Sequence, residues 1–117
     1  IVFCGVSPEL AQTMLRDRVT IPSGADAQHY ASAYGPGEFF AESVSKADAM
    51  AKPRKDGLCG ILVCRALLGN VHSTDESTPG VDAIMQRIRA EQCHSVCADR
   101  RNIADEHGGW REFVIYE

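Results

Sequence analysis

The chain has 117 residues, of which 44% are hydrophobic and 24% are charged, and its formal net charge is −4. A chain of this length forms one domain at most, and its apolar fraction argues against a disordered protein. Nucleic-acid-binding domains are usually basic, and the longest apolar run, residues 61–68, is too short to cross a membrane. We therefore expect one globular domain with no membrane and no direct nucleic-acid partner.

In chain order, the first predicted elements are a strand and a helix. The apolar residues 1–4 favour a buried strand that ends at Gly5. Ser7 can cap the free N–H groups of a following helix, Pro8 suits its first position, and the helix should run to about Arg18. The apolar residues predicted on its inward face are Leu10, Met14 and Leu15.

A loop at residues 21–24 precedes a second strand and a second helix. The strand is predicted at residues 39–41 and the helix at about residues 43–51. Residues 52–57 contain Pro and Asp-Gly, which interrupt helices and strands, so this basic cluster is interpreted as a solvated turn. The residues predicted to face inward from the helix are Val44, Ala47, Met50 and Ala51.

The strongest strand signal lies at residues 58–68. Both of its faces are mainly apolar, which predicts a central strand covered on both sides. A polar loop follows at residues 70–80, an amphipathic helix at 81–90, a charged loop at 100–109 and a last strand at 112–116. This order of elements predicts an α+β domain built around a mixed or antiparallel sheet.

Cysteine usage gives an expectation about the compartment. The chain has five cysteines, at positions 4, 59, 64, 93 and 97, and an odd count is unusual for a secreted disulfide scaffold. We therefore expect reduced thiols in an intracellular protein, either cytoplasmic or nuclear. Zinc is an alternative, for which the available ligands are Cys93, His94, Cys97 and His107.

Six different short motifs follow one another along nearly the whole chain. They lie in the segments 3–10, 34–43, 45–48, 62–69, 94–96 and 111–116. The series resembles the catalytic domain of the poly(ADP-ribose) polymerase family. That family shows His-Gly-Thr/Ser, Gly-x-Gly-Ile-Tyr-Phe-Ala, a Ser-Lys helix, Cys-Arg-Val-x-Leu-Gly, Ser-Val and Glu-Tyr/Phe-Val-Ile/Val-Tyr.

The resemblance implies a split mixed sheet, of the ADP-ribosyltransferase type, that binds NAD. The glycine whose backbone holds nicotinamide corresponds to Gly5, and the catalytic glutamate corresponds to Glu112. The two aromatic residues that stack on nicotinamide correspond to Phe39 and Met50. The serine that binds the carboxamide corresponds to Ala47. The implied activity transfers ADP-ribose from NAD to a protein acceptor and releases nicotinamide.

Three of the departures from the family pattern remove a hydrogen-bonding group. Cys4 stands where the family has the histidine that binds a ribose hydroxyl, and Phe39 lacks the phenol of the family tyrosine. Ala47 cannot donate to the carboxamide, so Ser45 or Ser43 would have to replace it. Each lost hydrogen bond costs about 0.5–1.5 kcal/mol, so the departures predict weaker NAD binding.

Glu112 is the residue on which the enzymatic interpretation depends. Strand alternation places it on one face with the apolar residues Val114 and Tyr116. Positive charge develops on the sugar when an N-glycosidic bond breaks, and a fixed carboxylate stabilises that charge. We expect transfer of single ADP-ribose units rather than polymer growth, because elongation requires a well-held second ADP-ribose.

Two other functions remain open. The departures at Cys4, Phe39, Ala47 and Met50 suit an inactive domain of the same fold that serves as an interaction module. A small zinc-binding interaction domain is the third hypothesis. The chain begins three residues before Cys4 and ends five residues after Glu112, so residues 1–117 are expected to be a partial catalytic domain.

Overall fold

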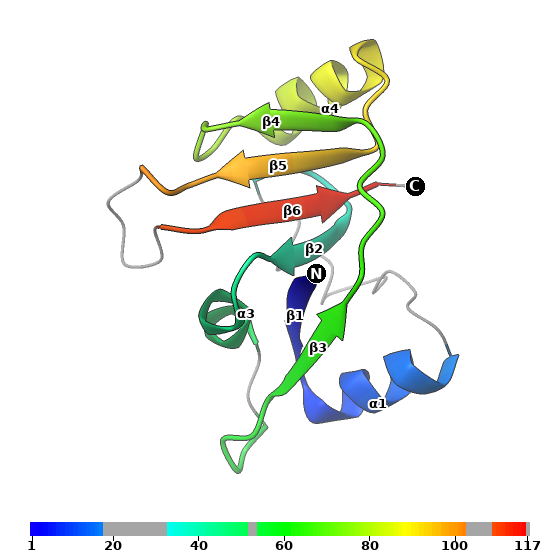
Figure 1. Cartoon of the computed structure of the whole chain (residues 1–117), viewed down its shortest axis with the longest axis vertical. Coiled ribbons are helices and arrows are strands. Elements are labelled where there is room, and N and C mark those ends of the chain that lie inside the picture. The colour runs from blue at the N-terminus through cyan, green and yellow to red at the C-terminus, as the bar shows by residue number, and fades with distance from the viewer. Residues whose placement is uncertain (18–32, 52–53, 103–108, 117) are drawn as a thin grey trace. The chain divides into compact units, whose positions relative to one another are not determined.

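The structure is a computed structural model that describes residues 1–17, 33–51, 54–102 and 109–116. Two compact units divide the chain: unit 1 comprises Ile1–Thr20 with Phe40–Ala66, and unit 2 comprises Ile21–Phe39 with Leu67–Glu117. In chain order the elements are β1 (Val2–Val6), α1 (Pro8–Asp17), β2 (Glu38–Ala41), α3 (Val44–Met50), β3 (Gly60–Cys64), β4 (Val71–Thr74), α4 (Val81–Ala90), β5 (Ser95–Asp99) and β6 (Arg111–Ile115) (Figure 1).

Hydrogen bonding connects the strands in the order β3-β1-β2-β6-β5-β4. The sheet is mixed, because β4 and β5 are parallel whereas β1 pairs antiparallel with both β2 and β3. Strand β2 is shared, with Glu38 and Phe39 in unit 2 and Phe40 and Ala41 in unit 1. The predicted α+β class with a mixed sheet is therefore confirmed.

In unit 1, helix α1 begins as its sequence predicts. The Leu10 backbone N–H donates to Ser7 Oγ at 3.2 Å, and Pro8 is the first helical residue. Met14 packs with strand residues in a small core, but Leu15 is 78% exposed, so its predicted inward position is wrong. The next residue along a helix is turned by about 100°, which carries Leu15 away from the strip that contacts the sheet.

Helix α3 is also capped by a serine. Ser43 Oγ accepts a hydrogen bond from the Lys46 backbone N–H at 3.2 Å, and the helix ends at Met50, one residue before its predicted end. Ala47 is buried, whereas Val44 is half exposed and the prediction for it is wrong. Val44 is the first residue of α3 and lies one turn before Ala47, whose carbonyl packs against Gly5 of β1.

The largest correction concerns β3. It is shorter than the predicted strand at residues 58–68, and it lies at one end of the strand order rather than at its centre. Leu62 is buried against α1, but Val63 is 69% exposed and Leu67 is 88% exposed. Apolar alternation on both faces cannot distinguish a covered strand from an edge strand, because the cover comes from residues far along the chain.

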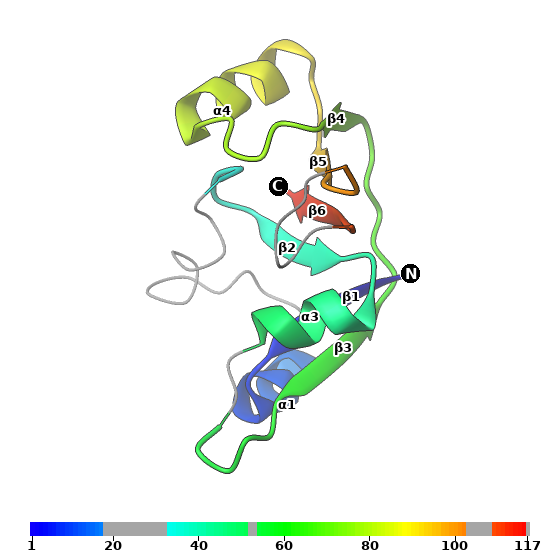
Figure 2. The same ribbon diagram turned by 90° about the vertical axis from the view of Figure 1, so that its left-hand side faces the viewer.

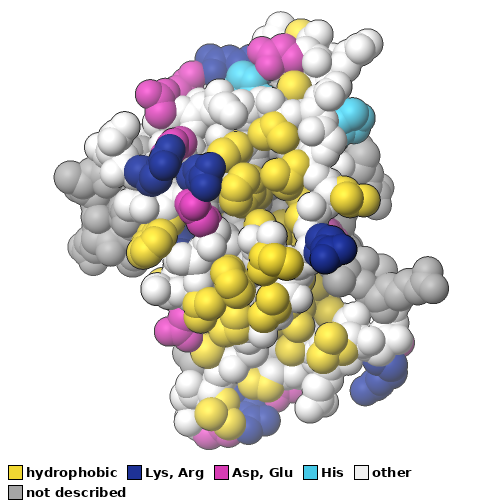
Figure 3. Space-filling view, in the orientation of Figure 1, with side chains coloured by type: hydrophobic (Ala, Val, Ile, Leu, Met, Phe, Trp, Pro, Cys, Tyr) yellow, Lys and Arg dark blue, Asp and Glu magenta, His cyan; other side chains and the backbone are white. Residues whose placement is uncertain are grey.

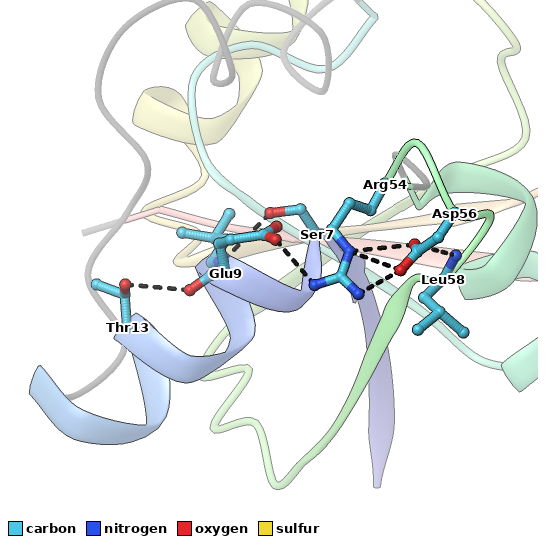
Figure 4. A network of polar contacts seen from close by, with 7 residues as sticks. Ser7, Glu9, Thr13, Arg54, Asp56 and Leu58 are labelled. Carbon is cyan, nitrogen blue, oxygen red and sulfur yellow. Dashed lines mark hydrogen bonds and ion pairs between the residues drawn. The ribbon is translucent and has the colours of Figure 1, made fainter.

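The turn between α3 and β3 is held by charge (Figure 4). The Arg54 side chain donates to the Asp56 carboxylate, which in turn accepts from the Leu58 backbone N–H at 3.1 Å. Arg54 also lies 3.4 Å from Glu9 at the start of α1. The guanidinium lowers the pKa of the Asp56 carboxyl. These contacts support the interpretation of residues 54–57 as a turn; residues 52 and 53 lie outside the described residues.

Unit 2 packs α4 against one face of its strands (Figure 2). Helix α4 has the predicted bounds, and Ile84 and Ile88 are buried in the core beside Val96 and Val114. The last strand, predicted at residues 112–116, is β6, one residue earlier.

Two strands of unit 2 were not predicted. Residues 71–74, predicted as loop, form β4, and residues 95–99 form β5. Only Thr74 is buried in β4, so its sequence shows none of the apolar alternation of a half-buried strand. Its strand geometry depends on the parallel pairing of residues 71–74 with residues 95–98. The predicted loop at 21–24 and residues 103–108 of the loop predicted at 100–109 lie outside the described residues.

Candidate functional site

In unit 1, Gly5 and Ala47 are brought together. Gly5 lies inside β1 rather than at its end, opposite Ile61 of β3. A Cβ atom added to Gly5 would lie 1.8 Å from the Ala47 carbonyl oxygen and 3.0 Å from Ala51 Cβ. Only a glycine therefore allows α3 to approach β1 this closely. Two of the predicted site residues meet at this point.

The other predicted site residues of unit 1 are Cys4, Ser45 and Met50, and they do not all face the contact between Gly5 and Ala47. Cys4 packs with the cluster of Val6, Met14 and Leu62 under α1. Because successive strand residues point to opposite faces, the Cys4 side chain lies on the other side of β1 from α3. On α3 itself, Ser45 is exposed and Met50 is partly buried.

In unit 2, Glu112 is the best-buried carboxylate of the described residues. It is 3% exposed, lies opposite Ala98 of β5, and shares the core face of β6 with Val114. The alternation predicted from the sequence is thus confirmed for this strand. Burial of a carboxylate in an apolar surrounding is costly unless it is compensated, and such groups are frequent in functional sites.

The Arg100 guanidinium offsets part of the cost of burying the Glu112 carboxylate. Arg100, directly after β5, places Nη1 3.7 Å from Glu112 Oε2, and the Arg100 side chain is only 20% exposed. A charged pair with so little solvent around it interacts more strongly than a surface pair. Sequence reasoning placed Arg100 in a charged loop and missed this contact, because the register of β5 against β6 creates it.

Tyr34 lies close to this pair and was also missed. Its hydroxyl donates to the Glu76 carbonyl at 2.8 Å, and its carbonyl accepts from the Tyr116 hydroxyl. Burial raises the pKa of the Tyr34 hydroxyl above its ordinary value, the Arg100 charge opposes that rise, and the Glu112 charge adds to it. A tyrosine directly before a Gly-Pro-Gly sequence was the available signal, but it does not indicate which carbonyl the tyrosine reaches.

Phe39 is the other predicted site residue of unit 2. It lies in β2 and packs, partly buried, against the core formed with Ile84, Val96 and Val114. Gly37, two residues before Phe39, approaches β6 closely, since a Cβ there would lie 2.6 Å from Val114 Cγ1. Phe39 therefore has a structural role in unit 2 whatever else it contacts.

The zinc hypothesis receives no support from the described residues. No group of three or more potential ligands among them could hold a metal ion, and His107 lies outside them. Cys93 Sγ lies 3.8 Å from Glu91, and His94 Nδ1 instead accepts a hydrogen bond from the Asn70 N–H at 3.0 Å. None of the five cysteines, all of which lie in the described ranges, forms a disulfide.

Comparison of the chain with protein-family models, with curated proteins and with solved structures gives no match. None of the helices in the described ranges combines the length and the apolar character that crossing a membrane requires.

Proposed function

We propose that the chain is an NAD-dependent ADP-ribosyltransferase domain that transfers single ADP-ribose units to a protein side chain. The observation that carries this proposal is the placement of Glu112: a carboxylate 3% exposed on the core face of a strand, at the position that the family resemblance gives to the catalytic glutamate. A structural glutamate near a strand end is expected to point toward solvent instead.

The chemistry follows from this placement. The bond between the ribose C1′ and the nicotinamide nitrogen breaks, nicotinamide leaves with the electron pair, and positive charge develops on the sugar. A nucleophilic atom of the acceptor protein then bonds to C1′ and loses its proton. A carboxylate in a low-dielectric surrounding stabilises this cationic transition state more than it stabilises the ground state.

The ion pair with Arg100 must break before the Glu112 carboxylate can stabilise the cationic sugar. A guanidinium 3.7 Å away cancels much of the field that the carboxylate would exert on the sugar. The pyrophosphate of NAD is an anion that guanidinium groups bind well, so it could take Arg100 from Glu112. We propose this exchange of partners as the step that activates the carboxylate.

The finer fold, a split sheet of the ADP-ribosyltransferase type, is part of the same proposal. In unit 1, the proposed split is supported by the difference between the β1–β3 pairing and the β1–β2 pairing. Strand β1 pairs with β3 at five successive positions, from Val2↔Cys64 to Val6↔Gly60, but with β2 only at Phe3↔Ala41. A sheet that is continuous on one side of a strand and brief on the other is the geometry expected where a sheet divides.

The test is incubation of the chain with isotopically labelled NAD and a mixture of acceptor proteins, with the chain itself as one acceptor. We expect covalent label in single-unit increments, and a loss of about 100-fold in Glu112→Gln. Glu76→Gln is the matched control, because it removes the same charge from an exposed glutamate of unit 2 that pairs with Arg87. Circular dichroism of each variant verifies folding. Absence of label with the unmodified chain would exclude the transferase.

A second candidate is an inactive domain of the same fold that serves as an interaction module. The Arg100–Glu112 pair favours it, because a permanently neutralised carboxylate has no catalytic field. The departures from the family at Cys4, Phe39 and Ala47 point the same way. Titration calorimetry separates the two: micromolar binding of NAD contradicts the module, and no binding of NAD or of nicotinamide contradicts the transferase.

A further inference from the structure

The exposed edge of β3 is unusual for its composition. Gly60–Cys64 pairs with β1 along one side, and no other strand of the described residues pairs with it. Edge strands normally carry a charged residue or a proline that prevents further pairing, but these five residues include neither. Val63 in the middle of the strand is 69% exposed, and hydrophobic side chains gather over β1 and β3 in the space-filling view (Figure 3).

We propose that this edge is the interface of a homodimer in which the β3 strands of two copies pair antiparallel. The two-fold axis passes through Leu62, so Leu62 lies opposite Leu62 of the second copy. Ile61 then lies opposite Val63 of the second copy, and Val63 opposite its Ile61. Paired strands place opposite residues on the same face, so the exposed Val63 side chain gains an apolar neighbour. Closed two-fold symmetry is the commonest form of association for identical chains.

Ion pairs between the two copies favour this register of the β3 strands, and they favour a second copy of the chain as the partner. One residue beyond the strand, the exposed Arg65 comes opposite Cys59 of the second copy. The Cys59 thiol donates to Asp48 at 3.1 Å, which holds this carboxylate beside Cys59. Each Arg65 therefore meets the Asp48 of the other copy, and the symmetry forms the pair twice. If the axis passed through Val63 instead, Arg65 would lie opposite the apolar Ile61.

A single chain carries both members of the proposed ion pair, the base Arg65 and the acid Asp48. Arg65, Asp48 and β3 all belong to unit 1. A strand from a different protein would have to carry an acid and a base at the same separation to make the same two ion pairs. A second copy carries them by construction.

The experiment is sedimentation velocity on the full chain over a range of concentrations. We expect a reversible monomer–dimer equilibrium. Val63→Lys introduces a charge at the centre of the interface and should abolish the dimer without unfolding the monomer, because the side chain is exposed in one copy. Leu15→Lys is the matched control: Leu15 is 78% exposed, against 69% for Val63, but lies on α1. It should leave the equilibrium unchanged.

A charge-reversal cycle tests the register. Arg65→Glu and Asp48→Lys should each weaken the dimer roughly tenfold, because each creates two repulsive contacts. An equimolar mixture of the two variants should form a mixed dimer of about the original affinity, because the acid introduced at position 65 faces the base introduced at position 48 and the remaining Arg65 faces the remaining Asp48. The double variant should recover the original affinity as well. A chain that stays monomeric at all concentrations overturns the proposal. So does a dimer that tolerates Val63→Lys, or one that is lost with Val63→Lys but is indifferent to charge reversal.

Discussion

Replacement of Gly5 by alanine is expected to destabilise the protein strongly. The new Cβ atom would lie 1.8 Å from the Ala47 carbonyl oxygen, whereas real Cβ atoms essentially never come within 3.0 Å of such a neighbour, so the two must separate by at least 3.0 − 1.8 = 1.2 Å. The obstructing atom is backbone, and it also accepts the Ala51 N–H hydrogen bond that ends α3. Overpacking costs about 1–3 kcal/mol and a strained hydrogen bond about 1 kcal/mol more.

The assay is thermal unfolding followed by circular dichroism, with urea unfolding as a second measurement. A loss of about 2–4 kcal/mol corresponds to a fall in Tm of roughly 8–15 °C for a chain of this length. Gly60→Ala is the control, since its nearest obstruction is the side-chain carbon of Ala11 at 3.0 Å, and it should cost less than about 1 kcal/mol. Ala51→Gly should not rescue Gly5→Ala, because it leaves the carbonyl in place. A Gly5→Ala variant that melts within 2 °C of the parent, roughly 0.5 kcal/mol, would refute the close packing of α3 on β1.

Three further predictions concern unit 2. Ser95→Ala removes the hydrogen bond that the fully buried hydroxyl donates to the Leu68 carbonyl at 2.7 Å, and should cost about 1–2 kcal/mol in urea unfolding. Burial raises the pKa of Tyr116 to about 12, so ultraviolet titration should show a late ionisation that Tyr116→Phe removes. The stability gained from its neutral form is present below pH 10 and is lost as the pH rises toward 12; Tyr116→Phe should remove that dependence. The Arg101 side chain lowers the pKa of Asp99 to about 2, so its stabilising effect is present above about pH 4 and is lost as the pH falls toward 2. In an NMR titration, Arg101→Gln should return the Asp99 midpoint toward 3.8.

Local signals predicted the elements whose stability is local. Helix α4 was predicted from the spacing of Val81, Ile84, Met85 and Ile88, and the start of α1 from its Ser-Pro sequence. The edge position of β3 and the existence of β4 could not be predicted, because each depends on which distant strand pairs with it and which helix covers it. Propensity carries no information on such partners.

The same division holds for the candidate site. Strand alternation correctly placed Glu112 on the core face of β6. The Arg100 guanidinium beside it and the α3 carbonyl against Gly5 were not predicted. Both contacts join residues that only the register of strands or the docking of a helix brings together, and neither register nor docking is written in a short motif.

The interleaving of the two units limits how the protein can be divided. The chain passes from one unit to the other at residues 20–21, 39–40 and 66–67, so neither unit is encoded by an unbroken stretch. A fragment that begins at Leu67 would keep α4 and its strands but lack Tyr34, a fully buried member of their core. No single truncation can separate the units intact. Only a permuted or rejoined gene, in which residues 21–39 precede residue 67 directly, could express unit 2 with its core complete.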